Sequence, residues 1–385
     1  MKKTTCIASL MVCLSMGQAG ALAQNIRIDM NKTYPEKTIS LQKVADVKYI
    51  PLETTDEALF NGVVTHLSAE GIAGFNKKEG DILVFDGTGK AIASFNHTGQ
   101  GPNEYNKIYH LDVDWKQKEV YVQDNFRQKI RIYALDGSHL RTIDLQETMQ
   151  QGDLYNFSDT HLIYYAKPKS KPVTAYQPVT LLSKKDASKA TLPFTKTDDN
   201  LVKATGGPFG NMKMSAKNVN LLCKKGDEVY VNEVTADVIY RVESNHALTP
   251  VVERTPSYQD ASGQDFFLML TGANARYYFF KRQQALLEFQ GNAATDTKST
   301  YVAYDRKEKQ LLNPTFTNED YPSQDISMSK LLQCAGSANR CYLQLEAFKL
   351  KEALAEGKLK GTLKSIAEKL DEEDNPVLMV VEFKK

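Results

Sequence analysis

A turn that begins with aspartate recurs every 50 residues in the first half of this chain, and this spacing constrains the fold more than any other feature. Asp86, Asp136 and Asp186 each follow a short apolar run of the kind that forms a β-strand. The first two also begin tight-turn sequences, Asp86-Gly87-Thr88-Gly89 and Asp136-Gly137-Ser138. A period of this length is typical of stacked or radial arrays of one small supersecondary unit.

The clearest repeat unit spans residues 111–145 and contains four short apolar or alternating runs. These runs are Leu111–Asp114, Val120–Val122, Ile130–Tyr133 and Leu140–Leu145. Connections of five, seven and six residues separate them, which is short enough to join neighbouring antiparallel strands. The unit is therefore predicted to be an antiparallel four-stranded meander.

Comparable units recur along the whole chain, so the sequence predicts an all-β fold, a six-bladed β-propeller with four-stranded antiparallel blades. The expected blades lie near 63–95, 111–145, 152–194, 218–253, 276–312 and 327–383. The last blade has only three strands of its own, and the N-terminal segment Val47–Leu52 is predicted to complete it. Pro51 suits an edge strand because it lacks an N–H group. Pairing of strands from both termini would close the ring. A β-sandwich is the alternative, but it gives no reason for the period.

One segment near the C-terminus departs from the strand pattern. Leu363, Ile366, Ala367 and Leu370 are spaced as one face of a helix, and Gly357 and Gly361 interrupt the pattern. We therefore expect one or two short helices within 349–371, inserted in the last blade. Nothing resembles a linker, so 24–385 is predicted to be a single domain.

The first 23 residues have the organisation of a secretory signal. Lys2 and Lys3 precede an apolar stretch that ends at Ala21-Leu22-Ala23, which is a small-x-small cleavage site. An amphipathic first helix is the alternative, but Gly17 and Gly20 would interrupt it. The sequence therefore predicts export to the periplasm, the extracellular space or the cell surface.

Composition excludes two classes of partner. The net charge of +1, with 25% charged residues, lacks the basic excess of a nucleic-acid binder. Beyond the signal, no run approaches the roughly 18–20 apolar residues of a membrane span. We expect a monomer without a transmembrane segment, whose partner is a protein, a peptide or a glycan.

Three cysteines lie beyond the signal. Cys334 and Cys341 flank a turn-rich hexapeptide, and they are either joined by a disulfide across a hairpin or present as two buried thiols. Cys223 is expected to be a buried free thiol. The spacing of cysteine and histidine does not support a structural zinc site.

Three stretches resemble a known family. Phe95–Tyr105, with its Gly-Gln-Gly-Pro-Asn-Glu-Tyr sequence, together with the strands that follow, resembles an NHL-type propeller repeat. With Tyr49–Thr55 and Glu373–Leu378, it makes the chain similar to the exported bacterial "6-bladed beta-propeller" family, which is largely uncharacterised. The resemblance implies a six-bladed propeller and supplies no activity or catalytic residues.

Candidate ligand-binding residues are chosen from the loops that a meander brings to one end. Connections between the second and third strands of a blade, and those between successive blades, emerge together, so their polar side chains are expected around the mouth of the central channel. The candidates are His97, Glu104, Tyr105, Asn125, Arg127 and Glu233. Arg127 suits either an anionic ligand or an ion pair with an acidic neighbour.

Asp112 and Asp114 are the weaker, metal-binding candidates. They lie on one face of an innermost strand, where they could line the channel and hold a cation such as calcium, or be solvated by channel water. No cofactor is otherwise expected.

The sequence favours a binding or scaffolding module over an enzyme. No nucleophile, zinc-protease or phosphate-loop motif occurs in it, so no catalytic residue is assigned. The alternative is a metal-assisted hydrolase or lyase with its site in the central channel. That enzyme would need three or more metal ligands converging on the axis.

Overall fold

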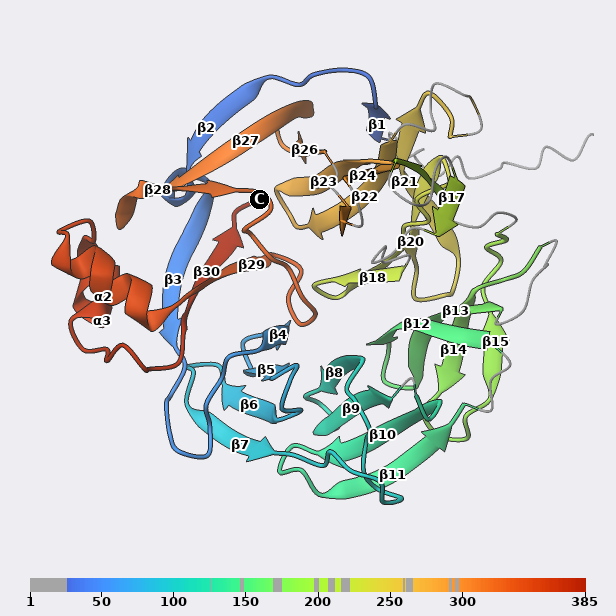
Figure 1. Cartoon of the computed structure of the whole chain (residues 1–385), viewed down its shortest axis with the longest axis horizontal. Helices are drawn as coiled ribbons and strands as arrows, with labels where there is room; N and C mark the ends of the chain where they lie inside the picture. The colour runs from blue at the N-terminus through green and yellow to red at the C-terminus, as the bar shows by residue number, and fades with distance from the viewer. Residues whose placement is uncertain are drawn as a thin grey trace, which may run out of the picture.

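The computed structural model confirms a six-bladed β-propeller (Figure 1). It describes residues 26–124, 126–145, 149–168, 175–196, 201–206, 212–215, 222–258, 260, 266–290, 293–294 and 298–385. The signal predicted over residues 1–23, and the candidate Asn125, lie outside these residues. Within the described residues, no helix is long and apolar enough to cross a bilayer.

The first three blades are four-stranded antiparallel meanders in chain order. Blade 1 contains β4 (Val63–Leu67), β5 (Gly71–Phe75), β6 (Ile82–Asp86) and β7 (Ala91–Phe95). Blade 2 contains β8 (His110–Asp114), β9 (Glu119–Asp124), β10 (Lys129–Ala134) and β11 (His139–Asp144). Blade 3 contains β12 (Met149–Asn156), β13 (His161–Pro168), β14 (Val179–Ser183) and β15 (Lys189–Thr191). The predicted boundaries of these blades are correct to within a few residues.

Blades 4 and 5 each carry an additional strand from the N-terminal segment. Blade 4 contains β18 (Leu222–Lys225), β19 (Glu228–Val231), β20 (Val238–Val242) and β21 (Leu248–Thr255), and β1 (Ile26–Asp29) adds in parallel to β21. Blade 5 contains β22 (Phe266–Ala273), β23 (Tyr277–Gln284), β26 (Ser299–Asp305) and β27 (Gln310–Asn318). On β27, β2 (Glu36–Ser40) adds in parallel and β28 (Tyr321–Ser327) pairs antiparallel. Blade 5 thus begins ten residues earlier than predicted, since β22 precedes Arg276.

Blade 6 is closed by chain from both termini, as predicted. The sheet order is β29 (Arg340–Leu345), β30 (Val377–Phe383) and β3 (Ala45–Pro51), so the final strand lies between a C-terminal and an N-terminal neighbour. Leu332 adds the innermost position through an antiparallel bridge to Tyr342. The short helix α1 (Leu41–Val44) leads into β3. The ring therefore closes through main-chain hydrogen bonds.

An additional four-stranded sheet, outside the six blades, was not anticipated from the sequence. It joins β16 (Leu201–Gly206) and β17 (Met212–Ser215), from the connection between blades 3 and 4, to β24 (Leu286–Gln290) and β25 (Ala293–Ala294) of blade 5. β16 and β24 pair in parallel. The 50-residue period contains no information about this pairing, because both segments are insertions into the repeat.

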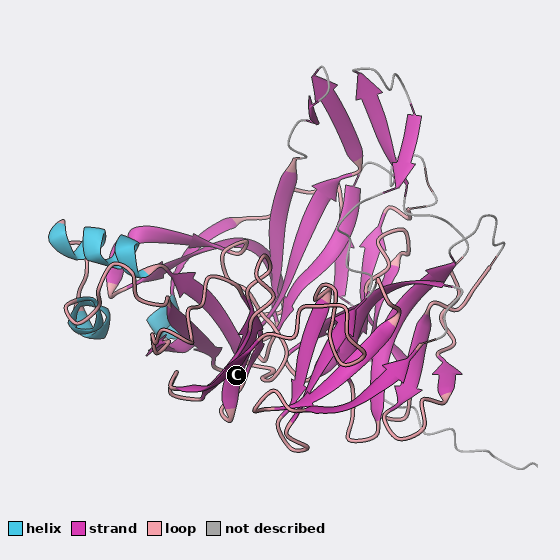
Figure 2. Ribbon diagram, turned by 60° about the horizontal axis from the view of Figure 1, so that its bottom comes forward, coloured by secondary structure: helices cyan, strands magenta, loops and turns pink. Residues whose placement is uncertain are grey.

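The predicted helical insertion is confirmed as α2 (Ala347–Ala355) and α3 (Gly361–Ala367). Figure 2 shows both helices at one edge of the molecule. Leu350 and Leu363 are buried in the same apolar cluster as strands of blades 5 and 6. The helices thus cover an outer side of the ring.

The second strand of each blade explains how the blades cohere. Adjacent side chains of a strand point to opposite faces, and here the two faces enter two different inter-blade clusters. The pairs are Ile72 and Ala73, Tyr121 and Val122, Leu162 and Ile163, Val229 and Tyr230, Phe279 and Phe280, and Cys341 and Tyr342. Since burial of each large side chain contributes about 1.5–3 kcal/mol, these continuously apolar strands hold neighbouring blades together.

The aspartate turns account for the period in the sequence. Asp86, Asp136 and Asp186 each accept a hydrogen bond at Oδ1 from the backbone N–H two residues later, at 2.8, 2.9 and 3.1 Å. Each turn connects the third and fourth strands of its blade. The repeated Asp is therefore a turn residue that caps its own backbone.

We predict that the N-terminal strands contribute unequally to folding. Deleting residues 24–40 removes β1 and β2 from outer edges. The shortened protein is expected to fold with a lower melting temperature, because the apolar cluster between blades 4 and 5 loses the buried Ile28 and Met30 side chains. Deleting residues 24–52 also removes β3 and exposes one edge of β30, and this protein is expected to lack a cooperative transition by circular dichroism. Equal stability of the two deletions would contradict this account of closure.

Candidate functional site

The axis of the propeller is filled by charged side chains that bind one another. The first strands of blades 1 to 5 form an inner ring, since β4, β8, β12, β18 and β22 contact one another in sequence. Asp112 of β8 is 1% exposed and lies at the centre of this arrangement. Its Oδ1 lies 3.3 Å from His66 Nδ1, and its Oδ2 accepts hydrogen bonds from Lys224 Nζ at 3.3 Å and Asn156 N at 2.8 Å. One carboxylate therefore links blades 1, 2, 3 and 4.

These contacts determine the ionisation of Asp112. Burial alone would raise the pKa of this carboxyl, but the Lys224 ammonium and the His66 ring outweigh burial and hold the pKa well below its usual range. Burial would also raise the pKa of Asp114, but Lys184 Nζ, which donates to its Oδ2 at 2.7 Å, lowers this pKa below its usual range. Both metal-binding candidates are therefore engaged by lysines, and a hard cation would have to displace an ammonium at either one.

A loop of blade 6 crosses the axis beside this cluster. Ala335 O accepts from Leu67 N of blade 1 at 2.9 Å, and Cys334 O accepts from Gly226 N of blade 4 at 3.1 Å. Gly336 has a φ of +111°, and a Cβ placed there would lie 2.6 Å from His66 Nε2. The segment 334–336, here called the axial loop, therefore fits against the charged cluster only with glycine at this position.

Cys334 and Cys341 are free thiols in the structure, so the candidate disulfide is not formed. The bridge between Leu332 and Tyr342 places Gln333, and not Cys334, opposite Cys341. Cys341 accordingly belongs to the cluster between blades 5 and 6, whereas Cys334 packs against the cluster between blades 6 and 1. Cys223 is a buried thiol outside any disulfide, as expected.

Four of the predicted ligand-binding residues lie together, but their side chains contact other groups of the protein. Tyr105 is fully buried; its hydroxyl donates to Gly80 O at 2.7 Å and accepts from His97 N at 3.0 Å. The His97 ring stacks on Tyr133 at 4.9 Å between ring centroids. The Glu104 carboxylate accepts from Gly101 N at 2.6 Å. These contacts stabilise the connection between blades 1 and 2.

Arg127 completes this connection in a way that neither sequence alternative anticipated. Its guanidinium donates to Gly101 O at 3.0 Å, to Gly99 O at 3.3 Å and to Gln100 Oε1 at 2.8 Å. The arginine from the loop between the second and third strands thus holds the connection between blades, which confirms that the two kinds of loop lie together. A Cβ at Gly99 would lie 2.0 Å from Glu104 Oε2, so any other residue there would force the Glu104 carboxylate to shift.

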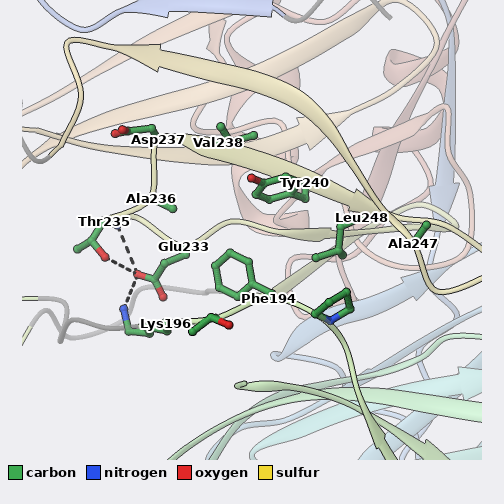
Figure 3. A pocket seen from close by; sticks show the side chains of 12 residues that line it. Phe194, Lys196, Glu233, Thr235, Ala236, Asp237, Val238, Tyr240, Ala247 and Leu248 are labelled. Atoms are coloured by element: carbon green, nitrogen blue, oxygen red, sulfur yellow. Dashed lines mark hydrogen bonds and ion pairs between the residues drawn. The ribbon is translucent and has the colours of Figure 1, made fainter. Parts of the chain in front are cut away.

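The equivalent position between blades 3 and 4 is open. Residues 193–196, which follow β15, and residues 233–238, at the start of β20, line a cleft of about 780 Å³ together with Tyr240, Ala247 and Leu248. We call this the blade 3–4 cleft (Figure 3). Glu233 is the one predicted residue in it, and it lies apart from the cluster around Arg127. The five candidates that the structure describes therefore do not form a single ring.

The charged groups of this cleft are occupied by internal contacts. Glu233 Oε1 lies 2.8 Å from Lys196 Nζ, with both side chains less than 5% exposed, and accepts from Thr235 Oγ1 at 3.2 Å. Tyr165 donates to Glu233 Oε2 at 3.4 Å. Burial, together with the nearby Glu233 charge, raises the pKa of the Tyr165 hydroxyl. Figure 3 draws the contacts of Glu233 with Lys196 and Thr235 as dashed lines. Together with the Tyr165 hydrogen bond, they make a fixed polar end to the cleft.

One side of the cleft is apolar. The Phe194 and Tyr240 rings lie edge to face at 6.2 Å between centroids, and Leu248 packs with them against the cluster between blades 3 and 4. Asp237 also lines the cleft, but its carboxylate accepts from Ser257 Oγ at 2.5 Å and from Tyr258 N at 2.7 Å. Sequence analysis missed Phe194, Lys196 and Tyr240, because only packing between two blades brings them together.

Comparison with known proteins supports the fold. A family model described as a domain of unknown function, DUF4934, matches residues 25–382. No protein of curated function matches the sequence. A crystal structure of a candidate exported protein from Bacteroides fragilis is similar at a TM-score of 0.63 and 14% identity, covering 94% of this chain and 99% of that one.

Two other solved structures are more distant. A DUF4221 family member from Bacteroides vulgatus has a TM-score of 0.49 and 8% identity, covering 89% of this chain and 98% of that one. Virginiamycin B lyase from Staphylococcus aureus has a TM-score of 0.39 and 9% identity, covering 88% and 99%.

We predict that Asp112→Asn strongly destabilises the propeller. The substitution leaves the Lys224 ammonium buried without its counter-charge, and breaking a buried pair in this way costs about 3–5 kcal/mol. Urea unfolding at pH 7 measures the loss, with Glu57→Gln, an exposed carboxylate, as the control. A loss below about 1 kcal/mol, the range of an exposed pair, would contradict the role of Asp112.

A second prediction concerns His110, whose ring packs on Tyr155 at 4.7 Å between centroids. Burial lowers the pKa of His110; Asp112 acts against this shift and Lys224 adds to it, and the pKa falls to about 4. Between about pH 6.5 and pH 4 the unfolded chain binds a proton that the folded protein excludes, so acidification is expected to remove up to about 3 kcal/mol of unfolding free energy.

His110→Phe keeps the ring and should abolish this part of the pH dependence. Urea unfolding at pH 7, 5.5 and 4.5 compares it with the wild type, and His246→Asn at an exposed position is the matched control. An unchanged pH profile in His110→Phe would refute the assignment.

Proposed function

Because this chain belongs to the DUF4934 family, whose description leaves the function open, we propose that it is an exported binding module that recognises an apolar polypeptide segment in the blade 3–4 cleft and carries out no bond chemistry. The observation that carries this proposal is the division of the cleft. Its charged groups bind one another, and the wall left to a ligand is made of Phe194, Tyr240, Val238 and Leu248. Aromatic and aliphatic walls of this kind accommodate the side chains that anchor protein interfaces.

The division of the cleft into a polar end with internal contacts and an apolar wall favours a peptide over a glycan. A sugar presents many hydroxyl groups, and each of them loses hydrogen bonds with water unless the site supplies a partner. Glu233 and Asp237 already accept hydrogen bonds within the protein, so a sugar would have to compete for them. An apolar or aromatic side chain needs only to displace water from the Phe194–Tyr240 wall.

Export is part of this proposal and rests on the signal organisation of residues 1–23. The similar Bacteroides fragilis protein, itself described as a candidate exported protein, is compatible with it. That Phe95–Tyr105 and the strands after it form an NHL-type repeat stays a prediction.

The alternative of a metal-assisted hydrolase or lyase is less well supported. Its site would lie on the axis, where Lys224 and Lys184 already bind Asp112 and Asp114. An ammonium beside each carboxylate repels a divalent cation and takes up the oxygen atoms that would coordinate it. The binding proposal requires no such displacement.

A peptide selection tests the proposal. Peptides selected on the wild-type protein from a random displayed library are expected to be rich in aromatic and aliphatic residues. Tyr240→Ala should weaken them by about thirtyfold or more, as removal of a central aromatic anchor does. Affinities are measured by fluorescence anisotropy, and Leu248→Ala provides a second variant in case Tyr240→Ala is unstable.

Phe126→Ala is the matched control, because this phenylalanine is 75% exposed beside Arg127 in the corresponding loop of blade 2. Its affinity for the selected peptides should equal that of the wild type. If the selected peptides bind Tyr240→Ala and Leu248→Ala with the affinity of the wild type, the cleft is not the binding site. If the protein binds only to a glycan array and to no peptide, the ligand class proposed here is wrong.

A further inference from the structure

A second cavity lies beside the axial loop, among inner strands of the propeller. Its volume is about 380 Å³, and it is lined from β4, β18, β22, β29 and the segment 328–334. We call it the axial cavity. Most of its wall is apolar, and the residues of this wall are Val64, Met269, Leu270, Met328, Leu331 and Tyr342. Leu332, which is 44% exposed, also lines the axial cavity.

One cation lines the axial cavity. Lys225 follows Lys224 in β18, and since successive side chains of a strand point to opposite faces, Lys224 reaches Asp112 while Lys225 lies at the axial cavity. Among the described residues, no carboxylate forms an ion pair with Lys225. A half-buried ammonium beside an apolar wall favours an anion, because the low local dielectric strengthens the attraction.

The neighbouring thiols do not neutralise Lys225. Burial raises the pKa of Cys341 to about 12, and burial likewise raises the pKa of Cys334. Both groups are therefore uncharged thiols near neutral pH, although Lys225 is close enough to act on them electrostatically.

A hydroxyl without a partner also lines the axial cavity. The pairing of β22 with β23 shifts between Leu270 and Gly272, so Thr271 is the extra residue of a β-bulge. Bulges redirect a side chain, and Thr271 lines the cavity while its Oγ1 is buried and makes no hydrogen bond within the structure. A buried hydroxyl in this condition calls for a ligand atom or water.

We propose that the axial cavity binds a small amphipathic carboxylate, whose anionic head pairs with Lys225 and accepts a hydrogen bond from Thr271 while its hydrocarbon body lies on the apolar wall. The volume lies in the range of small-molecule sites, about 300–1,000 Å³. Charge complementarity selects the head group, and the Met269, Met328 and Leu331 side chains select the body. This site is separate from the blade 3–4 cleft and does not depend on it.

Octanoate and 1-octanol are suitable probes because they share the hydrocarbon body and differ in charge. Isothermal titration calorimetry should detect octanoate binding to the wild-type protein. Lys225→Met keeps the apolar stem and removes the charge, and it is expected to weaken octanoate by at least about tenfold while changing the affinity for 1-octanol by less than about threefold. Thr271→Val, which is nearly isosteric, should weaken octanoate severalfold.

Lys48→Met, at an exposed position of β3, is the matched control and should bind octanoate like the wild type. Circular dichroism and urea unfolding establish that each variant is folded, and Thr271→Val carries the test if Lys225→Met is not. The proposal is overturned if millimolar octanoate does not bind the wild type, or if the folded variants bind octanoate unchanged. Failure of the peptide selection would not affect either result.

Discussion

The buried carboxylate of Asp112 is the interaction on which the arrangement of the blades depends. The six inter-blade clusters supply the hydrophobic stabilisation, but apolar contact has little direction and would tolerate small rotations of one blade against the next. Asp112 receives hydrogen bonds from strands of blades 3 and 4 and contacts the His66 ring of blade 1. Because a buried charge is costly without its partners, these bonds fix the position of the inner strands.

The sequence predicted those parts of the fold that arise within one repeat. The 50-residue period reflects a turn in which Asp86, or its counterpart, bonds its own backbone, and such local chemistry is readable from residue types. Closure by β3 was also predictable, because blade 6 lacked a strand and Val47–Leu52 was an unassigned segment with a proline, Pro51, near its end. The sheet formed by β16 and β24 was not, since its parallel pairing joins two insertions that share no pattern.

The candidate site was predicted only in part, because loop position does not determine side-chain direction. Arg127 and Glu233 occupy corresponding loops of blades 2 and 4. Arg127 turns into the inter-blade connection and fills it, whereas Glu233 pairs with Lys196 and leaves a cleft beside the pair. The difference depends on the groups in the preceding connection between blades. Residues 99–101 present three oxygen acceptors to Arg127, whereas the connection after blade 3 presents Lys196 to Glu233. Sequence alone did not indicate which side chain would meet which loop.

The axial loop connects the two features of the propeller centre. Its residues accept main-chain hydrogen bonds from blades 1 and 4 beside the axis. The segment that leads into it, 331–334, forms part of the wall of the axial cavity. Gly226 bonds the axial loop and directly follows Lys224 and Lys225, which face Asp112 and the cavity respectively. An anion paired with Lys225 would therefore bind to a strand that the ion pair between Lys224 and Asp112 already holds in place. Since Lys224 keeps that strand fixed, a ligand would meet a preformed cation, and little of its binding energy would be lost in ordering the site.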